Sequence, residues 1–235
     1  MKIFWFYLSR FLRHSRLCLF LNIKSGNIVI KFFPTSLSTT LWLYPEYSNI
    51  DIKNIRSYLK RNDTFVDVGA NIGHLSLEAW SKVGPKGNVI AIEGNKKIYN
   101  YLSKNIIFND AKIKIHNVIV GKKSGYAGIQ NKKADDMNQV LEEGNIEMKT
   151  LDEICYNLPK IDFLKIDVEG YELEVLKGSM KTLKKTNIIL LEILETLTNN
   201  FEHTSNDIYK FLKIRNFRLL KNLGNGNYLF KNKKR

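Results

Sequence analysis

The sequence predicts an α/β fold built around a mostly parallel β-sheet, and three observations support this prediction. From residue 63 onward, short apolar runs alternate with segments whose apolar residues recur at helical spacing. The apolar run Phe65–Val68 ends in a glycine-containing turn, Gly69–Gly73, after which a helical pattern begins. Further on, Gly224-Asn225-Gly226 separates two apolar runs, which is a strong signal for an antiparallel hairpin.

Length, charge and cysteine content narrow the class of protein. With 235 residues, the chain can form one large α/β domain with an appendage. The net charge is +14: residues 1–62 carry ten Lys or Arg against two acids, and residues 204–235 carry nine against one. These basic ends fit either an anionic partner or a solvated, lysine-rich surface. Cys18 and Cys155 have no paired spacing, so we expect reduced thiols in a cytoplasmic protein.

The first 22 residues mix aromatic side chains with arginines. The arginines interrupt the apolar residues, so the segment lacks the roughly 20 apolar residues that span a bilayer. We favour a helix packed against the domain; the alternative is a basic amphipathic helix that gives residues 1–22 peripheral contact with the inner face of the membrane. Residues 1–62 are therefore predicted to be a basic N-terminal extension of helix and short strands, and residues 63–235 the main domain.

The elements can be predicted in chain order. In the extension, we expect short strands at Asn27–Phe33 and Thr40–Leu43 and a helix at Ile50–Lys60. The strands predicted for the main domain are Phe65–Val68, Val89–Glu93, Ile113–Val118, Phe163–Asp167 and Ile188–Ile193. The helices predicted between and after them are His74–Lys82, Lys97–Phe108, Glu172–Lys184 and Asn206–Lys213.

Two segments depart from this alternation. Residues 119–149 contain four glycines and have no helical pattern, which predicts hairpins or an arm over the sheet. The final hairpin pairs Phe217–Lys221 with Tyr228–Lys231. An α/β domain that ends in an antiparallel hairpin differs from the dinucleotide-binding arrangement of six parallel strands.

The glycine turn and an acid on the next strand together predict a nucleoside site. A strand that stops at such a turn and restarts as a helix directs backbone N–H groups and the helix N-terminus into one crevice. Gly69 allows a positive φ or a close backbone approach, and Gly73 allows tight helix packing. Glu93 ends the next predicted strand, where a carboxylate can accept hydrogen bonds from both ribose hydroxyls.

The same turn helps to distinguish between two ribose-containing cofactors. A dinucleotide site needs a glycine for backbone approach to the pyrophosphate, and this chain has Asn71 there. Asp67 would repel a pyrophosphate but suits the ammonium and sulfonium groups of S-adenosylmethionine, directly or through water. The sequence therefore favours S-adenosylmethionine, and an NAD(P)-dependent oxidoreductase is the alternative.

A third motif lies in the segment Phe163–Gly178, FLKIDVEGYELEVLKG. A near-continuous apolar strand, with Lys165 as its exception, ends at Asp167, and Glu169 follows before a helical pattern begins. Ligands of open α/β sheets bind outside the carboxyl ends of the strands. We therefore expect both carboxylates to face the crevice beside the cofactor.

Together, DVGANIG, the acid at Glu93, TLDEI and DFLKIDVEGYELEVLKG resemble the FkbM family of S-adenosylmethionine-dependent methyltransferases, over roughly Asp63 to Glu192. The resemblance implies the class I methyltransferase fold, a Rossmann-like three-layer sandwich with a seven-stranded sheet ordered 3-2-1-4-5-7-6 and a C-terminal antiparallel hairpin. It also implies O-methylation of a hydroxyl on a sugar, a glycan or a polyketide-like product. The family often has a proline after the ribose acid, whereas this chain has Gly94-Asn95.

The resemblance also assigns the site residues. By position, it assigns Asp67, Gly69, Asn71 and Gly73 to the cofactor loop, Glu93 to the ribose acid, and Asp167 with Glu169 to the motif after the fourth strand. We expect Asp167 and Asn117 to bind the cofactor as well. A sugar hydroxyl must lose its proton during methylation, so a nearby general base helps. We expect Asp167 or Glu169 to take this role, with His74 and His116 as weaker candidates and Glu192 as a residue that orients the substrate.

We also predict which partners the enzyme uses. No His or Cys cluster is present, so we expect metal independence, although Asp167 and Glu169 offer the oxygen atoms that divalent cations bind. The expected acceptor is a sugar- or polyketide-like compound that carries a hydroxyl group. A lipid-linked or an anionic form of such a compound is a further alternative. A nucleic-acid methyltransferase is a third reading because of the basic ends. The Asn/Asp-Pro-Pro-aromatic motif of amino-directed enzymes is missing from the sequence, so no specific nucleic acid is expected.

Overall fold

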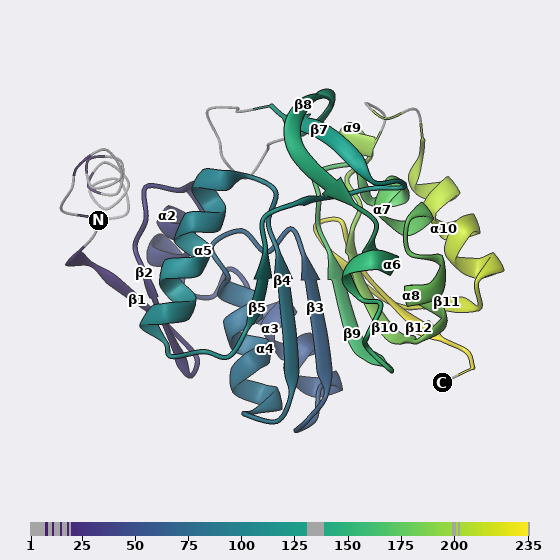
Figure 1. The fold of residues 1–235 in the computed structure, drawn as a ribbon. Helices are drawn as coiled ribbons and strands as arrows, with labels where there is room; N and C mark the ends of the chain where they lie inside the picture. Colours follow the sequence, from purple (N-terminus) through teal and green to yellow (C-terminus); the bar gives the residue numbers. More distant parts are fainter. Residues whose placement is uncertain are drawn as a thin grey trace.

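The computed structural model describes residues 20–130, 139–198, 201 and 203–234, together with Leu8, Phe11, Ser15 and Cys18. A seven-stranded sheet forms its centre (Figure 1), in the order β11-β12-β10-β9-β3-β4-β5. Its strands are β3 (Thr64–Val68), β4 (Asn88–Ile92), β5 (Lys114–His116), β9 (Ile161–Ile166), β10 (Thr186–Glu192), β11 (Phe217–Gly224) and β12 (Asn227–Asn232). Neighbouring strands from β10 to β5 run parallel, and β12 is antiparallel to β10 and β11. Numbered by position in the chain, this is the predicted order 3-2-1-4-5-7-6.

Helices cover both faces of the sheet, which gives three layers (Figure 1). On β3, Val66 and Val68 pack on one face, whereas Phe65 packs on the other. The first face is covered by α6 (Leu151–Ile154), α7 (Glu172–Lys177), α8 (Met180–Lys184) and α10 (Ser205–Ile214). The second is covered by α3 (Asn49–Tyr58), α4 (His74–Val83) and α5 (Lys96–Phe108). A short helix, α9 (Glu195–Thr198), follows β10.

The N-terminal strands and helices pack against the main domain. A hairpin of β1 (Asn22–Ser25) and β2 (Ile28–Lys31) precedes α2 (Ser36–Leu43) and α3. Phe32 and Phe33 are buried in one cluster with residues of α4 and α5. This packing does not test the predicted division at residue 62, which stays a prediction.

One strand predicted in this region is wrong. Thr40–Leu43 lies in helix α2, because Thr35 caps that helix: its side chain accepts a hydrogen bond from the Ser38 backbone N–H at 3.0 Å. Capping and the burial of Leu41 outweigh the strand preference of the threonines. The predicted strand at Asn27–Phe33 is confirmed as β2, and the helix at Ile50–Lys60 as α3.

The helix expected in residues 1–22 falls mostly outside the described residues, so its packing against the domain stays a prediction, and membrane contact stays the alternative. Within the described part of the chain, no helix is both long and apolar enough to cross a membrane.

The arm predicted over the sheet is present. It is a small sheet ordered β6-β8-β7, formed by β6 (Ile119–Val120), β7 (Gly125–Ile129) and β8 (Val140–Lys149). Strands β7 and β8 form an antiparallel hairpin. Figure 1 shows this hairpin beyond the ends of the parallel strands, where it can wall a site.

The single helix predicted at Glu172–Lys184 is wrong in one respect, because it is broken into α7 and α8 at Gly178 and Ser179. A Cβ atom on Gly178 would lie 2.1 Å from the carbonyl oxygen of Gly121, so this position packs directly against the arm. The Asp152 carboxylate accepts a hydrogen bond from the Thr182 N–H at 2.6 Å and thereby caps the second helix from outside. Tertiary contacts therefore interrupt a continuous helical pattern.

Candidate active site

The turn after β3 adopts the conformation that its glycines predict. Gly69 and Gly73 have φ of +79° and +87°, and Asn71 between them has φ of 50°. A Cβ on Gly69 would lie 1.8 Å from the Asp167 carbonyl oxygen, so only glycine fits where the loops after β3 and β9 meet. The N–H groups of Gly69 and Ala70 both donate to the Ile92 carbonyl, at 3.0 and 2.9 Å. These bonds fix the turn beside the end of β4.

Glu93 is joined to this turn by its carboxylate. Its Oε2 accepts a hydrogen bond from the Asn71 N–H at 2.9 Å, and its Oε1 accepts one from the Asn95 N–H at 2.8 Å. Burial raises the pKa of Glu93 to about 7, against the opposing effect of the two N–H donors. The predicted ribose acid is therefore fixed in orientation and titrates near neutral pH.

A crevice of about 100 Å³ opens between the turn, Glu93 and the arm. Its apolar wall consists of Val68, Ile92, Ile98, Val118, Ile119, Val120, Ile129, Val140 and Val168. The side chain of Asn117, which the sequence places at the cofactor, donates to the carbonyls of Glu93 and Gly94 at 2.8 and 3.0 Å. Asn117 thus supports the loop that carries Glu93 and does not itself line the crevice.

A buried lysine lies at the centre of the site. Lys165, on β9, places its Nζ 3.3 Å from Asp67 Oδ1 and 3.1 Å from Asp167 Oδ2, and it donates to the Gly69 carbonyl at 2.9 Å. Burial lowers the pKa of a lysine, but here the charges of Asp167 and Asp67 outweigh burial and raise it. Asp67 is fully buried and also accepts a hydrogen bond from Ser76 Oγ at 2.5 Å. The carboxylate of Asp67 is thus already engaged within the protein.

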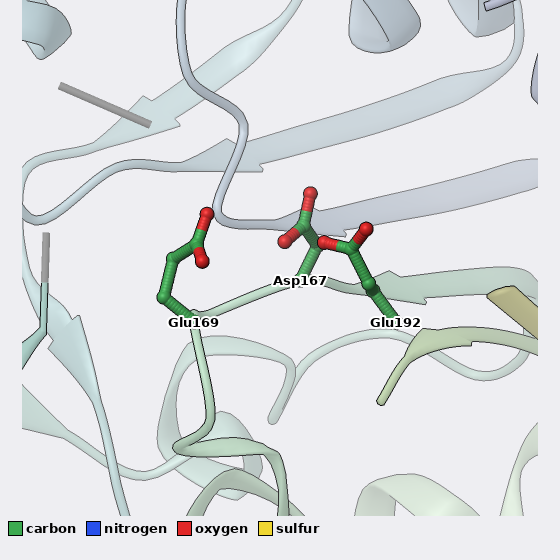
Figure 2. A group of neighbouring side chains, drawn as sticks. All are labelled: Asp167, Glu169 and Glu192. Carbon is green, nitrogen blue, oxygen red and sulfur yellow. The ribbon is translucent and has the colours of Figure 1, made fainter. Parts of the chain in front are cut away.

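Three carboxyl groups gather at the ends of β9 and β10 (Figure 2). Asp167, Glu169 and Glu192 each have an oxygen within 4.8 Å of the others. Burial, and then the negative charge of Asp167, raise the pKa of Glu192 to about 10, so Glu192 is protonated at neutral pH. Burial opposes ionisation of Asp167, but the Lys165 ammonium and a hydrogen bond with Glu192 hold its pKa below the usual range. Glu192 and Asp167 therefore form an acid–carboxylate pair.

In the described part of the chain, this cluster is the one group of His, Cys, Asp or Glu side chains close enough to hold a metal ion. The oxygen atoms are of the type that divalent cations bind. A protonated Glu192 and the ammonium of Lys165 beside Asp167 both work against a cation there. Metal independence stays a prediction.

A second, larger cleft of about 420 Å³ adjoins the crevice. Both are lined by Gly69, Asn71, Asp167 and Glu169. The walls of the cleft come from distant parts of the chain: the N-terminal segment, the start of α4, and the turn between β11 and β12. Side chains from these parts include Leu37, Thr40, Tyr47, Ser48, Asp51, His74, Leu223, Asn225 and Asn227. A small crevice thus adjoins a larger cleft.

The two candidate histidines have different positions. His74 lines the cleft, and its Nε2 lies 2.9 Å from Ser25 Oγ and 3.4 Å from Ser48 Oγ. Burial, and then the charge of Lys165, lower its pKa to about 4, so it is neutral at physiological pH. His116 lines a separate cleft with Lys112, Lys114 and Lys149, and the structure does not bring it to Asp167.

Several residues of the site escaped the sequence analysis. Lys165 is the one charged residue in an otherwise apolar stretch of its strand, and this departure from the pattern is the signal that could identify it as a site residue. Asp51 lines the cleft from the first turn of α3, where no motif marks it. The turn between β11 and β12 was predicted as a hairpin, but its position beside the cleft depends on the sheet order.

This sheet order, with a glycine turn after its first parallel strand and a fixed acid after its second, defines the class I fold of S-adenosylmethionine-dependent methyltransferases. A model of the methyltransferase FkbM domain matches residues 67–219. The chain belongs to this methyltransferase family, whose cofactor is S-adenosylmethionine. The residues present suit this cofactor, because Glu93 presents a carboxylate of fixed orientation at the crevice, where it can accept hydrogen bonds from a ribose.

Two curated proteins resemble the chain. The hexuronic acid methyltransferase AglP of Haloferax volcanii is 31% identical over 141 residues, which is 57% of each chain. The methyltransferase sdnD of Sordaria araneosa is 30% identical over 168 residues, or 54% of this chain and 63% of the relative. The chain thus matches about three fifths of the length of these relatives.

Solved structures resemble the fold. An S-adenosylmethionine-dependent methyltransferase from Clostridium acetobutylicum aligns over 80% of this chain and 91% of its own, with a TM-score of 0.50 and 12% identity. This similarity bears on the fold alone.

Proposed function

We propose that the protein transfers a methyl group from S-adenosylmethionine to a hydroxyl group of a sugar, a glycan or a related natural product. The observation that carries this proposal is that Asp167 and Glu169 line both the crevice and the adjoining cleft. Carboxyl groups at this junction would lie between a donor in the crevice and an acceptor in the cleft. The name of AglP, a hexuronic acid methyltransferase, supports a sugar as the acceptor.

Within this proposal, the chain's own residues bind and align the two reactants. When bound, the cofactor supplies an electrophilic methyl group on a sulfonium. Glu93, whose carboxylate is oriented by the Asn71 N–H, would hold the ribose hydroxyls of the donor, and the glycine turn would hold the rest of it. Methyl transfer is an in-line displacement in which the positive charge of the sulfonium is lost. The main contributions of the protein are therefore to align the acceptor oxygen, the methyl group and the sulfur and to exclude water.

The electrostatics of the carboxyl cluster assign different roles to its members. Asp167 is a weak base, because Lys165 and Glu192 hold its pKa low. Glu192 carries a proton at neutral pH and cannot accept one. We therefore assign Glu169 as the general base that removes the proton of the acceptor hydroxyl. Asp167 and Glu192 orient the acceptor, and His74 forms part of the wall.

The test is methyl transfer from labelled S-adenosylmethionine to a panel of soluble and lipid-linked glycans, with calorimetry of S-adenosylhomocysteine binding. Loss of a general base typically costs about 10²- to 10⁴-fold in rate, so Glu169→Gln should lower kcat by that amount with the Kd for S-adenosylhomocysteine unchanged. Asp110→Asn removes an exposed acid outside both clefts and serves as the matched control. Near-normal turnover of Glu169→Gln would show that the base is misassigned, and failure to bind S-adenosylhomocysteine would refute the donor.

A further inference from the structure

The acceptor cleft has a charge opposite in sign to that of the whole protein. The chain carries a net charge of +14. The described residues that line the cleft nevertheless include five with carboxyl groups and one lysine: Asp51, Asp67, Asp167, Glu169, Glu192 and Lys165. The remaining ionisable imidazole, that of His74, is neutral at physiological pH.

The single lysine does not cancel this negative charge. Its Nζ is shared between Asp67 at 3.3 Å and Asp167 at 3.1 Å, so two carboxylates already face one ammonium. Glu192 is neutral because it is protonated. Asp67, Asp167 and Lys165 together therefore carry a net negative charge. The carboxylates of Asp51 and Glu169 add to it.

Asp51 adds a carboxylate from a distant part of the chain to the lining of the cleft. It lies in the first turn of α3, in the N-terminal part of the chain, whereas the cluster follows β9 and β10. Burial raises the pKa of Asp51, the positive charge of Lys165 opposes this rise, and the weaker effect of the Asp167 charge adds to it. Asp51 thus lies within Coulombic range of both Lys165 and Asp167.

We propose that the acceptor is a sugar without a carboxylate, either uncharged or bearing an amino group, and that Asp51 and Glu169 exclude hexuronates. This inference rests on the proposed function. A carboxylate brought into a partly desolvated cleft of the same sign would meet repulsion with no arginine or unshared lysine among the described lining residues to offset it. An ammonium on the sugar would instead be attracted. The hexuronic acid specificity in the name of AglP would then not extend to this chain.

The test compares three acceptors that differ in one group: methyl β-glucoside, methyl β-glucosaminide and methyl β-glucuronide. Their binding to the full chain, saturated with S-adenosylhomocysteine at pH 8, is measured by calorimetry, and methyl transfer from labelled S-adenosylmethionine is measured in parallel. Like-charge repulsion of this kind costs on the order of tenfold, so the glucuronide should bind at least about tenfold more weakly than the glucoside. The glucosaminide should bind at least as tightly as the glucoside.

Asp51→Asn removes one wall charge and should bring the Kd of the glucuronide closer to that of the glucoside by about threefold or more. Asp110→Asn removes an exposed acid outside the cleft and should leave the ratio unchanged. Thermal melting of both variants checks that the fold is retained.

Each outcome separates this inference from the proposed function. Equal or tighter binding of the glucuronide would overturn the inference and leave sugar methylation standing. A shift in the ratio of Kd values by Asp110→Asn as large as that by Asp51→Asn would also overturn it. If none of the three sugars binds while S-adenosylhomocysteine does, the inference fails and the donor assignment stands. If S-adenosylhomocysteine itself does not bind, the proposed function fails first.

Discussion

Glu93 combines a fixed orientation with a pKa near 7, which makes the affinity for the cofactor depend on pH. The ionised carboxylate accepts hydrogen bonds from both ribose hydroxyls, whereas the protonated form loses one acceptor. Because burial raises this pKa to about 7, protonation at lower pH should weaken binding. We expect the Kd for S-adenosylhomocysteine to rise about tenfold between pH 8 and pH 6, measured by calorimetry. In Glu93→Gln, binding should be weak at both pH values, and an unchanged pH dependence in this variant would contradict the assignment.

Glu172 provides a second prediction at the residue scale. Its Oε1 accepts hydrogen bonds from the N–H groups of Val168 and Gly170 at 3.2 and 3.0 Å and so holds the loop that carries Glu169. Burial raises its pKa to about 7, against the effect of those donors. The folded state therefore keeps a proton that the unfolded state releases near pH 4.5, and the resulting stability is complete below that pH and lost as pH rises through 7.

Glu172→Gln removes this titration. Relative to the variant, the wild type should lose about 3 kcal/mol of unfolding free energy between pH 4.5 and pH 7 and then level off. Urea denaturation at a series of pH values measures this difference. A constant difference across the series would mean that Glu172 does not titrate in this range.

Sequence reasoning identified the residues of the site that belong to local motifs. The positive φ of Gly69 and the position of Glu93 follow from a strand, a turn and a helix in succession. Lys165 and Asp51 could not be assigned in the same way, because their roles arise from neighbours that are distant in the chain. Lys165 contacts Asp67 and Gly69, nearly a hundred residues earlier, and Asp51 lines the same cleft as Asp167, which lies far later in the chain.

Among the elements, α5 links the N-terminal hairpin to the glycine turn through one buried side chain. Asn105 accepts a hydrogen bond from the Lys31 N–H of β2 at 2.9 Å and donates one to the Ile72 carbonyl at 2.8 Å. Asn105→Ala leaves both backbone groups unpaired, so the free energy of unfolding should fall by about 2–4 kcal/mol in urea denaturation. Asn100 is exposed on the same helix, and Asn100→Ala should be neutral or slightly stabilising because alanine favours helix. A similar loss in both variants would show that the two hydrogen bonds of Asn105 are not its cause.

Helices and strands could be predicted from the sequence where the spacing of the apolar residues and the length of the segment indicated the same type of element. Strands β3, β4, β9 and β10 and helices α4 and α5 lie where apolar patterns placed them. Thr40–Leu43 was misassigned because a cap at Thr35 decides the conformation of residues that favour strands by themselves. Glu172–Lys184 was joined into one helix because its break at Gly178 depends on the close approach of Gly121 in the arm.

At the scale of the whole molecule, the N-terminal extension shares its core with the main domain. Phe32 is fully buried among residues that include Leu77 of α4 and Leu102 of α5. Phe32→Ala should therefore lower the unfolding free energy by about 3–5 kcal/mol, within one cooperative urea transition. Phe20 is exposed, so Phe20→Ala should change it by no more than about 0.5 kcal/mol. A separate early transition in Phe32→Ala would instead indicate an extension that unfolds by itself.

The acceptor cleft is completed by the turn between β11 and β12, which has a consequence for the order of events during translation. The crevice for the methyl donor is lined by residues up to Glu169, whereas the cleft also needs residues up to Asn227. At about 5–20 residues per second, a ribosome takes roughly 3 to 11 s to travel from Glu169 to Leu223, the first residue of this hairpin that lines the cleft. Ribosome-bound chains stalled at increasing lengths should therefore retain S-adenosylhomocysteine before they retain a sugar. A growing chain would meet its methyl donor while the place for the acceptor is still being synthesised.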